Sequence, residues 1–174
     1  MSILTLVGNP RPGSRTLAVA GAAAQAVGGR LGAAEGSYET VDLSELGPHL
    51  LSPGKSPGVE AALELVREAS VLVVASPTYK GTYTGLLKSF IDRFPPDALA
   101  GKVALPLLVM GDAKHSLAVE VHLRPLLVEV GATVPTPGLV VLESQLSGLE
   151  EVLAAWADRV APQVAAVLKE GVLG

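Results

Sequence analysis

Residues 71–85 read VLVVASPTYKGTYTG and join an apolar run to a loop of small polar residues. The run, Val71–Ala75, is continuously hydrophobic and mostly β-branched, which is typical of a strand covered on both faces of a parallel sheet. The loop holds two of the three tyrosines of the chain, Tyr79 and Tyr83, although only 3% of the residues are aromatic. The tyrosines of a plain turn would pack on the surface. Their concentration here favours contact with a ligand.

Strand-like runs alternate with helix-like segments on both sides of this stretch. Four further strands are predicted at Ile3–Val7, Tyr38–Leu43, Lys102–Met110 and Thr133–Leu142. Apolar residues recur at helical spacing in residues 14–31, 59–69, 86–94, 116–130 and 149–168. Such alternation implies right-handed crossovers between parallel strands. The sequence therefore predicts an α/β fold with a five-stranded parallel sheet and helices on both faces.

Four prolines constrain this assignment. Pro106 lies inside a predicted strand, although proline cannot donate to a strand ladder. Pro135 and Pro137 suit the last strand only if it lies at the edge of the sheet. Pro162 predicts a bend in the last helix.

Composition narrows the classes of function. Hydrophobic residues make up 49% of the chain and charged residues 17%, which argues against disorder. A net charge of −4 argues against binding to a nucleic-acid backbone. No apolar run reaches the roughly 18–20 residues of a membrane helix, and the N-terminus lacks a signal-peptide pattern. We therefore expect a cytoplasmic protein without nucleic-acid or membrane partners.

The residue types that bind metals are sparse. The chain has no cysteine, which excludes thiol chemistry and iron–sulfur ligation. Its three histidines, His49, His115 and His122, do not have metal-ligand spacing. We expect no metal site, so redox chemistry would require a bound organic cofactor.

The loop after the first strand, GNPRPGSRT (residues 8–16), is suited to an anion. It matches neither GxGxxG nor GxxxxGK[ST], the patterns of dinucleotide and nucleoside triphosphate sites. It gathers basic and hydroxyl residues at a helix N-terminus, namely Arg11, Ser14, Arg15 and Thr16. Exposed N–H groups and the helix dipole favour negative charge there, which suits a phosphate monoester. The alternative is an ordinary turn in which Ser14 only caps the helix.

The tyrosine loop is suited to a flat ring. Pro77 and Gly81 shape a backbone that can lie against a planar ligand, and Tyr79 and Tyr83 can stack or donate. Lys80 can neutralise negative charge, as on a reduced isoalloxazine ring. The third loop, GDAKHS (residues 111–116), could close the other side of the pocket, although its residues alone favour a solvated loop.

The segments that follow three of the strands resemble the NAD(P)H-dependent FMN reductases, in the branch paired with alkanesulfonate and methanesulfonate monooxygenases. The resemblance extends to about Val140 and is carried by GNPRPGSRT, SPTYKGTYTGLLKSFIDRFP and GKVALPLLVMGDAKHSLAVEVHLRPLLVEVGA. It implies a single flavodoxin-like FMN-binding domain over residues 1–174, a three-layer sandwich. It also implies reduction of FMN by NADPH or NADH. FMN often behaves in this branch as a substrate that leaves reduced, which implies an FMNH2-dependent monooxygenase as partner.

The resemblance also assigns site residues. It implies that the FMN phosphate is surrounded by Arg11, Ser14, Arg15 and Thr16. It implies that the flavin ring is lined by Pro77, Thr78, Tyr79, Lys80 and Gly81, with Gly111 at the remaining edge. Lys80 is the candidate for stabilising reduced flavin, and no catalytic acid or base is assigned.

Residues 116–130 predict an interface, because their apolar side chains surround the helix instead of forming one stripe. One side would face the sheet and the other a partner subunit, which gives a homodimer or homotetramer. Relatives assemble through the corresponding helix, and some carry a tyrosine where His122 aligns. We interpret His122 as a packed or interface residue and not as a catalyst.

Other readings remain open at this level. The same loops would serve an enzyme that keeps FMN and reduces quinones, azo dyes, chromate or organoarsenicals. An electron-carrier flavoprotein without a nicotinamide site is a second alternative, although such carriers surround their flavin with acidic residues and these loops are basic. A non-flavin interaction protein on the same fold is a third. No residue distinguishes NADPH from NADH.

Overall fold

The computed structural model describes residues 1–170 and contains one five-stranded sheet. All neighbouring strands are parallel, in the order β2-β1-β3-β4-β5. The strands are β1 (Ile3–Val7), β2 (Tyr38–Asp42), β3 (Val71–Pro77), β4 (Val103–Met110) and β5 (Leu139–Leu142). This is the strand order of flavodoxin-like sheets, and it confirms the predicted fold class.

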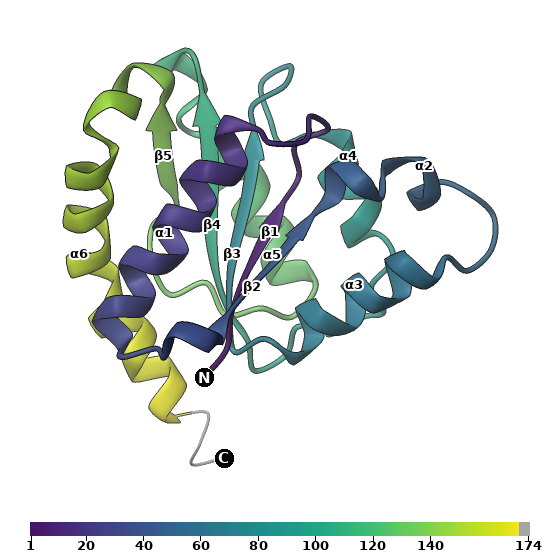
Figure 1. The fold of residues 1–174 in the computed structure, drawn as a ribbon, viewed down its shortest axis with the longest axis horizontal. Coiled ribbons are helices and arrows are strands. Elements are labelled where there is room, and N and C mark those ends of the chain that lie inside the picture. The colour runs from purple at the N-terminus through teal and green to yellow at the C-terminus, as the bar shows by residue number, and fades with distance from the viewer. Residues whose placement is uncertain (171–174) are drawn as a thin grey trace.

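Helices cover both faces of the sheet (Figure 1). One face packs against α1 (Arg15–Leu31) and α6 (Leu149–Glu170). The other packs against α3 (Pro57–Glu68), α4 (Gly85–Ile91) and α5 (Arg124–Glu129). A short helix that the sequence did not predict, α2 (Gly47–Leu50), precedes the loop into α3. The arrangement is the predicted three-layer sandwich.

The central strand explains why its sequence is continuously apolar. Every residue of β3 is buried. Val71 and Val73 pack toward α1 and α6, whereas Leu72 and Val74 pack toward the helices of the opposite face. Successive side chains of a strand point to opposite faces, so a strand covered on both sides needs apolar residues at every position.

Pro106 is accommodated inside β4 because no neighbouring strand accepts a hydrogen bond from the backbone at this position. The N–H of Ala104 donates to the carbonyl of Thr133, on the side of β4 that faces β5. Donors alternate along a strand, so the nitrogen of Pro106 faces the same side. On that side β5 pairs with β4 only from Leu107 onward. The missing donor of Pro106 therefore lies in a gap between two pairings.

The last predicted strand, residues 133–142, was too long. Thr133 forms a single bridge with Val103, and β5 itself is limited to Leu139–Leu142 at the edge of the sheet. Pro135 and Pro137 occupy the stretch between them, and neither can donate to a ladder. The first half of the predicted strand is therefore wrong, whereas the edge position that the two prolines require is confirmed.

The predicted helix at residues 116–130 is present, but it is not a uniform α-helix. A π-helical turn at Val119–Leu123 leads directly into α5, which begins at Arg124. Pro125 at the start of α5 cannot donate to the preceding turn, which removes one α-helical bond. α6, by contrast, continues through Pro162 as one helix.

Most other predicted boundaries agree with the structure to within a few residues. Strand β2 ends at Asp42, one residue early, because a 3₁₀ turn starts at Leu43. Helix α4 stops at Ile91, before Phe94. No helix within residues 1–170 combines the length and the hydropathy needed to cross a membrane.

Candidate functional site

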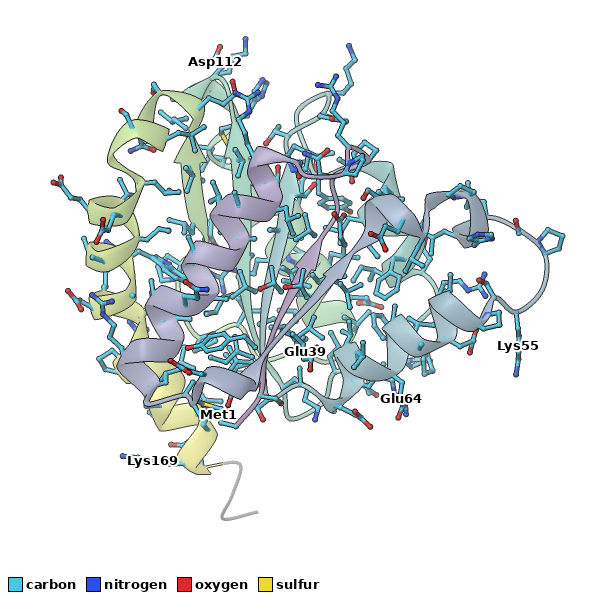
Figure 2. All side chains as sticks on the ribbon, in the orientation of Figure 1. Met1, Glu39, Lys55, Glu64, Asp112 and Lys169 are labelled. Atoms are coloured by element: carbon cyan, nitrogen blue, oxygen red, sulfur yellow. The ribbon has the colours of Figure 1, made fainter. Side chains whose placement is uncertain are left out.

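The carboxyl ends of the strands meet at one edge of the sheet, where the loops after β1 and β3 lie side by side. The chain order reverses between these two strands, since β2 lies beyond β1 and β4 beyond β3. Ligands of open α/β sheets bind at such a switch point. Figure 1 shows the loop after β3 projecting at this upper edge, and Figure 2 shows Asp112 there, far from Met1 and Lys169.

A cleft of about 430 Å³ opens at this edge. The loop after β1 and the start of α1 form most of its wall, and the ends of β3, β4 and β5 complete it. Six of its lining residues are predicted site residues: Arg11, Ser14, Arg15, Thr16, Pro77 and Tyr79. The sequence analysis missed the other five: Asn9, Pro12, Gly13, Val109 and Glu143. The structure thus brings the first two predicted loops to one cavity.

The N-terminus of α1 presents free donors to the cleft. Ser14 is the N-cap, with an extended backbone, and its hydroxyl accepts a hydrogen bond from the N–H of Leu17. The first N–H groups of a helix have no partner within it, so those of Arg15 and Thr16 are available. No acidic residue lies in the first turn. This end of the helix is therefore suited to an anion.

Asn9 forms the floor below these donors. Its amide nitrogen donates to the hydroxyl of Thr16 at 3.1 Å, and its amide oxygen accepts from the N–H of Arg11 at 3.0 Å. Asn9 and Thr16 are both buried. They fix the loop after β1 against the helix. Asn9 could have been identified as a site residue from the sequence, because it follows Gly8 directly after the first strand.

Thr84 ties the two loops together. Its hydroxyl donates to the carbonyl of Gly8 and accepts from the N–H of Leu87 at 3.2 Å, while its own N–H donates to the hydroxyl of Ser76 at 3.0 Å. Gly8 lies so close to α4 that an added Cβ would stand 2.6 Å from the Cβ of Leu87. Only glycine fits there without a shift of the helix.

The tyrosine loop is a tight hairpin. The N–H of Tyr79 donates to the carbonyl of Thr82 at 2.8 Å, and the N–H of Thr82 donates back at 3.4 Å. The two residues between them, Lys80 and Gly81, have φ of 52° and 88°. Positive φ at both central positions is the signature of a type I′ turn, in which glycine and asparagine are preferred. A lysine there carries local backbone strain and projects from the edge of the sheet.

Two hydroxyls of this loop have no partner. The Oγ1 atoms of Thr78 and Thr82 are buried, and neither forms a hydrogen bond in the structure. Buried polar groups are usually bonded, so these two unpaired hydroxyls cost stability in the hairpin as it stands. The two tyrosines differ: Tyr79 lines the cleft and is 42% exposed, whereas Tyr83 packs against the core under α4. Of the two, only Tyr79 lies where it could stack on a ligand in the cleft.

The remaining predicted residues lie beside the cleft. Thr78, Lys80 and Gly81 continue the hairpin beyond its wall, and Gly111 follows β4, whose Val109 lines the cleft instead. These four are close to the site but do not form its wall.

The polar contacts of the third loop, residues 111–116, are made within the loop, and none of its residues lines the cleft. The Lys114 ammonium lies 2.9 Å from the Asp112 carboxylate, which also accepts the N–H of Lys114. That backbone hydrogen bond lowers the pKa of Asp112 below its usual value. The charge of Lys114 is thus paired within its own loop, which agrees with the solvated loop favoured by the residues alone.

Glu143 is the acidic member of the wall. It directly follows β5, and its Oε1 lies 3.0 Å from Nη2 of Arg15. Its place after the last predicted strand was a usable signal, because all carboxyl ends of a parallel sheet share one edge. The sequence analysis considered only the loops after the first, third and fourth strands.

The 117–128 surface lies apart from the cleft. Its large apolar side chains are exposed, with Leu117 at 72%, Val121 at 57% and Val128 at 54%. His122 is exposed among them, so it is not packed within the chain. The opposite side of the segment, including Val119, Leu123 and Leu127, is buried in the core. Among residues 1–170, no group of three or more His, Asp or Glu side chains could hold a metal ion.

Comparison with known proteins gives consistent results. The profile of the NADPH-dependent FMN reductase family matches residues 1–147. An FMN reductase (NADPH) of Escherichia coli K12 is 33% identical over 148 residues, which cover 84% of this chain and 75% of the relative. The NADH-dependent FMN reductase SfnE of Pseudomonas putida is 29% identical over 161 residues, 92% of this chain and 87% of the relative. The apo crystal structure of an NADH:FMN oxidoreductase (EMOB) has a TM-score of 0.77 at 33% identity, covering 99% of this chain and 88% of that one.

Proposed function

Because the chain belongs to the NADPH-dependent FMN reductase family, we propose that it transfers a hydride from NAD(P)H to FMN bound in the cleft at the β1–β3 switch point. The observation that carries this proposal is the continuity of the cleft. An anion site at the N-terminus of α1 and the Tyr79 side chain line the same cavity of about 430 Å³.

The residues present fit FMN. The phosphate would accept from the N–H groups of Arg15 and Thr16, from the Ser14 hydroxyl and from the guanidinium groups of Arg11 and Arg15. The ring would lie along the Tyr79 hairpin, where Pro77 and Tyr79 line the cleft. This fit supports the flavin site assigned from the sequence.

Most of the catalysis that we propose is positional. Bound FMN would supply the redox chemistry, as the acceptor of the hydride. The chain holds the ring and the nicotinamide in register, which by itself accounts for a large part of the rate of such a transfer. The Lys80 ammonium, on the hairpin, would favour the more electron-rich reduced ring. No side chain of the cleft is assigned as a general acid or base.

Both nicotinamides belong to the proposal, because the printed names of the relatives include NADPH-dependent and NADH-dependent reductases. We also propose that FMN is a substrate that leaves reduced and supplies an FMNH2-dependent monooxygenase. A homodimer or homotetramer formed through the 117–128 surface and the cytoplasmic location are further parts of the proposal. The exposed apolar side chains of that surface support the oligomer.

The first experiment is oxidation of NADPH and of NADH by flavin-stripped protein, with and without added FMN. Turnover that rises with free FMN on the order of micromolar supports the free-flavin reductase. A yellow protein that turns over only with a quinone or metal acceptor would show that FMN is retained. Bound flavin without nicotinamide oxidation would indicate an electron carrier, and absence of flavin binding would indicate an interaction protein.

Replacing Tyr79 tests where the ring lies. We expect Tyr79→Ala to impair flavin binding or reduction without unfolding the domain, because its side chain is half exposed at the cleft. Tyr83→Phe is the matched control, since Tyr83 packs against the core. If Tyr79→Ala shows wild-type kinetics, the flavin ring does not lie at this hairpin.

A further inference from the structure

The Arg15–Glu143 ion pair lies in the cleft in which the phosphate of FMN is proposed to bind. Glu143 is the one acidic residue among those that line the cleft. Its carboxylate contacts the same guanidinium that extends from the first turn of α1, at 3.0 Å. A carboxylate and a phosphate both accept hydrogen bonds from arginine through charged oxygens. The Glu143 carboxylate thus makes the contact with Arg15 that an oxygen of the phosphate would make.

This ion pair is readily exchanged. The side chains of Arg15 and Glu143 are 64% and 44% exposed, and pairs at such exposure are held weakly and screened by salt. A phosphate monoester carries a charge of about −1.5 to −2 near neutral pH and three strong acceptor oxygens. A phosphate bound at the N-terminus of α1 would therefore displace Glu143 from Arg15.

Displacement does not remove Glu143 from the cleft. The residue directly follows β5 and begins a 3₁₀ turn, so its backbone is fixed beside the wall. After the exchange, its carboxylate would remain near the phosphate without its former partner, and like charges at short range repel. Both the lost ion pair and the new repulsion would weaken phosphate binding.

We propose that Glu143 competes with the phosphate of FMN for Arg15 and thereby limits how tightly the protein holds the flavin. This inference rests on the proposed FMN site and adds a residue that determines affinity there. A site in which an internal anion opposes the ligand suits a flavin that must leave after reduction. The class of ligand affected is any flavin with a 5′-phosphate, whereas riboflavin, which has none, is unaffected.

The test is the direct binding of FMN and riboflavin to the wild type and to Glu143→Gln, followed by quenching of flavin fluorescence without nicotinamide. We expect Glu143→Gln to lower the Kd for FMN about three- to tenfold and to leave the Kd for riboflavin unchanged. Asp158→Asn is the matched control. It removes one exposed carboxylate from an ion pair with Arg30 at 2.8 Å, away from the cleft, and should change neither Kd.

A double-variant cycle shows whether the effect acts through Arg15. With Arg15→Gln in place, the gain from Glu143→Gln should shrink, because the two side chains no longer compete. An FMN affinity that is unchanged or weaker in Glu143→Gln would overturn the inference, and a weaker one would make Glu143 a residue that positions Arg15. Equal tightening of FMN and riboflavin would overturn it too. If the wild type binds no FMN, both the inference and the proposed function fail. If the wild type and Glu143→Gln bind FMN equally, only the role of Glu143 is rejected.

Discussion

The floor below the cleft (Gly8, Asn9, Thr16 and Thr84) and its rim (the hairpin at residues 78–82) contain similar polar residues, but only on the floor are the buried hydroxyls hydrogen-bonded. On the floor, Thr16 and Thr84 are buried and their hydroxyls are bonded to Asn9 and to the carbonyl of Gly8. On the rim, the buried hydroxyls of Thr78 and Thr82 have no partner. Unsatisfied buried groups cost stability unless a ligand meets them. The floor therefore holds the loops in place, whereas the rim leaves two buried hydroxyls unpaired.

The backbones of the floor and the rim also differ, because the residue suits its backbone position on the floor but not on the rim. Gly8 on the floor lies against α4 so closely that no side chain fits. Lys80 on the rim adopts a φ of 52°, where glycine would be more stable. The floor thus uses the residue that its geometry demands, whereas the rim retains a strained lysine. This contrast separates changes that should affect stability from those that should affect flavin binding.

The largest effect is expected on the floor. Thr84→Val preserves shape but removes the cap of α4 and the bond to Gly8, leaving a buried carbonyl unpaired. We expect the free energy of unfolding to fall by about 2–4 kcal/mol, measured by urea denaturation. Thr84→Ser keeps the hydroxyl and should lose much less. Equal stability of Thr84→Val and the wild type would remove the distinction between floor and rim.

The next effect concerns the anion site. The double variant Ser14→Ala, Arg15→Ala removes a hydroxyl and a cation from the cleft. We expect the Kd for FMN to rise about ten- to a hundredfold, as for the loss of a charged hydrogen bond, with a much smaller change for riboflavin. Part of the loss in stability, about 1 kcal/mol, would come from the missing N-cap. Equal losses for both flavins would place the phosphate site elsewhere.

The rim should show opposite effects on stability and function. Lys80→Gly relieves the positive φ, so we expect the protein to become more stable by about 0.5–1 kcal/mol while FMN reduction slows. Lys80→Ala is the control, because it removes the ammonium but keeps the unfavourable backbone. Thermal unfolding and steady-state NADPH oxidation measure the two effects. A destabilised Lys80→Gly would show that the lysine side chain, and not its backbone, governs the hairpin.

The smallest effect lies outside the cleft, where Glu120 forms a satisfied cluster like that of the floor. Its carboxylate accepts from Arg124 and from the N–H of Gly138, and the hydrogen bond from Arg124 lowers the pKa of Glu120 below its usual value. The ionised form is therefore favoured by folding. Its contribution is complete above the unfolded pKa of about 4.3 and is lost as the pH falls further.

Glu120→Gln should flatten this pH dependence. As the pH falls below about 4.3, we expect the wild type to lose more stability than the variant does, by less than about 1 kcal/mol, since the pair is partly exposed. Urea denaturation at several pH values measures the difference. Identical pH profiles would mean that the carboxylate contributes nothing beyond its neutral hydrogen bonds.

The sequence predicted much of the candidate site because two of its loops carry local patterns. Ser14 is recognisable as a cap, and the Tyr79 loop follows an unmistakable buried strand. Glu143 was missed because no motif accompanies its place after the last strand, and its partner Arg15 is distant in sequence. Tyr83 was expected to share the role of Tyr79, but it packs against the core and does not line the cleft.

By itself, the sequence determined the order of strands and helices and the parallel sheet, because hydrophobic periodicity and caps are local signals. Through Pro135 and Pro137, it also determined that the last strand lies at the edge of the sheet. Only the tertiary structure decided which loops share a cavity and which hydroxyls remain unpaired. It also brought Glu143 to Arg15. These features depend on the lateral order of the strands, which brings residues from opposite ends of the chain to one edge and leaves no local pattern that would pair them.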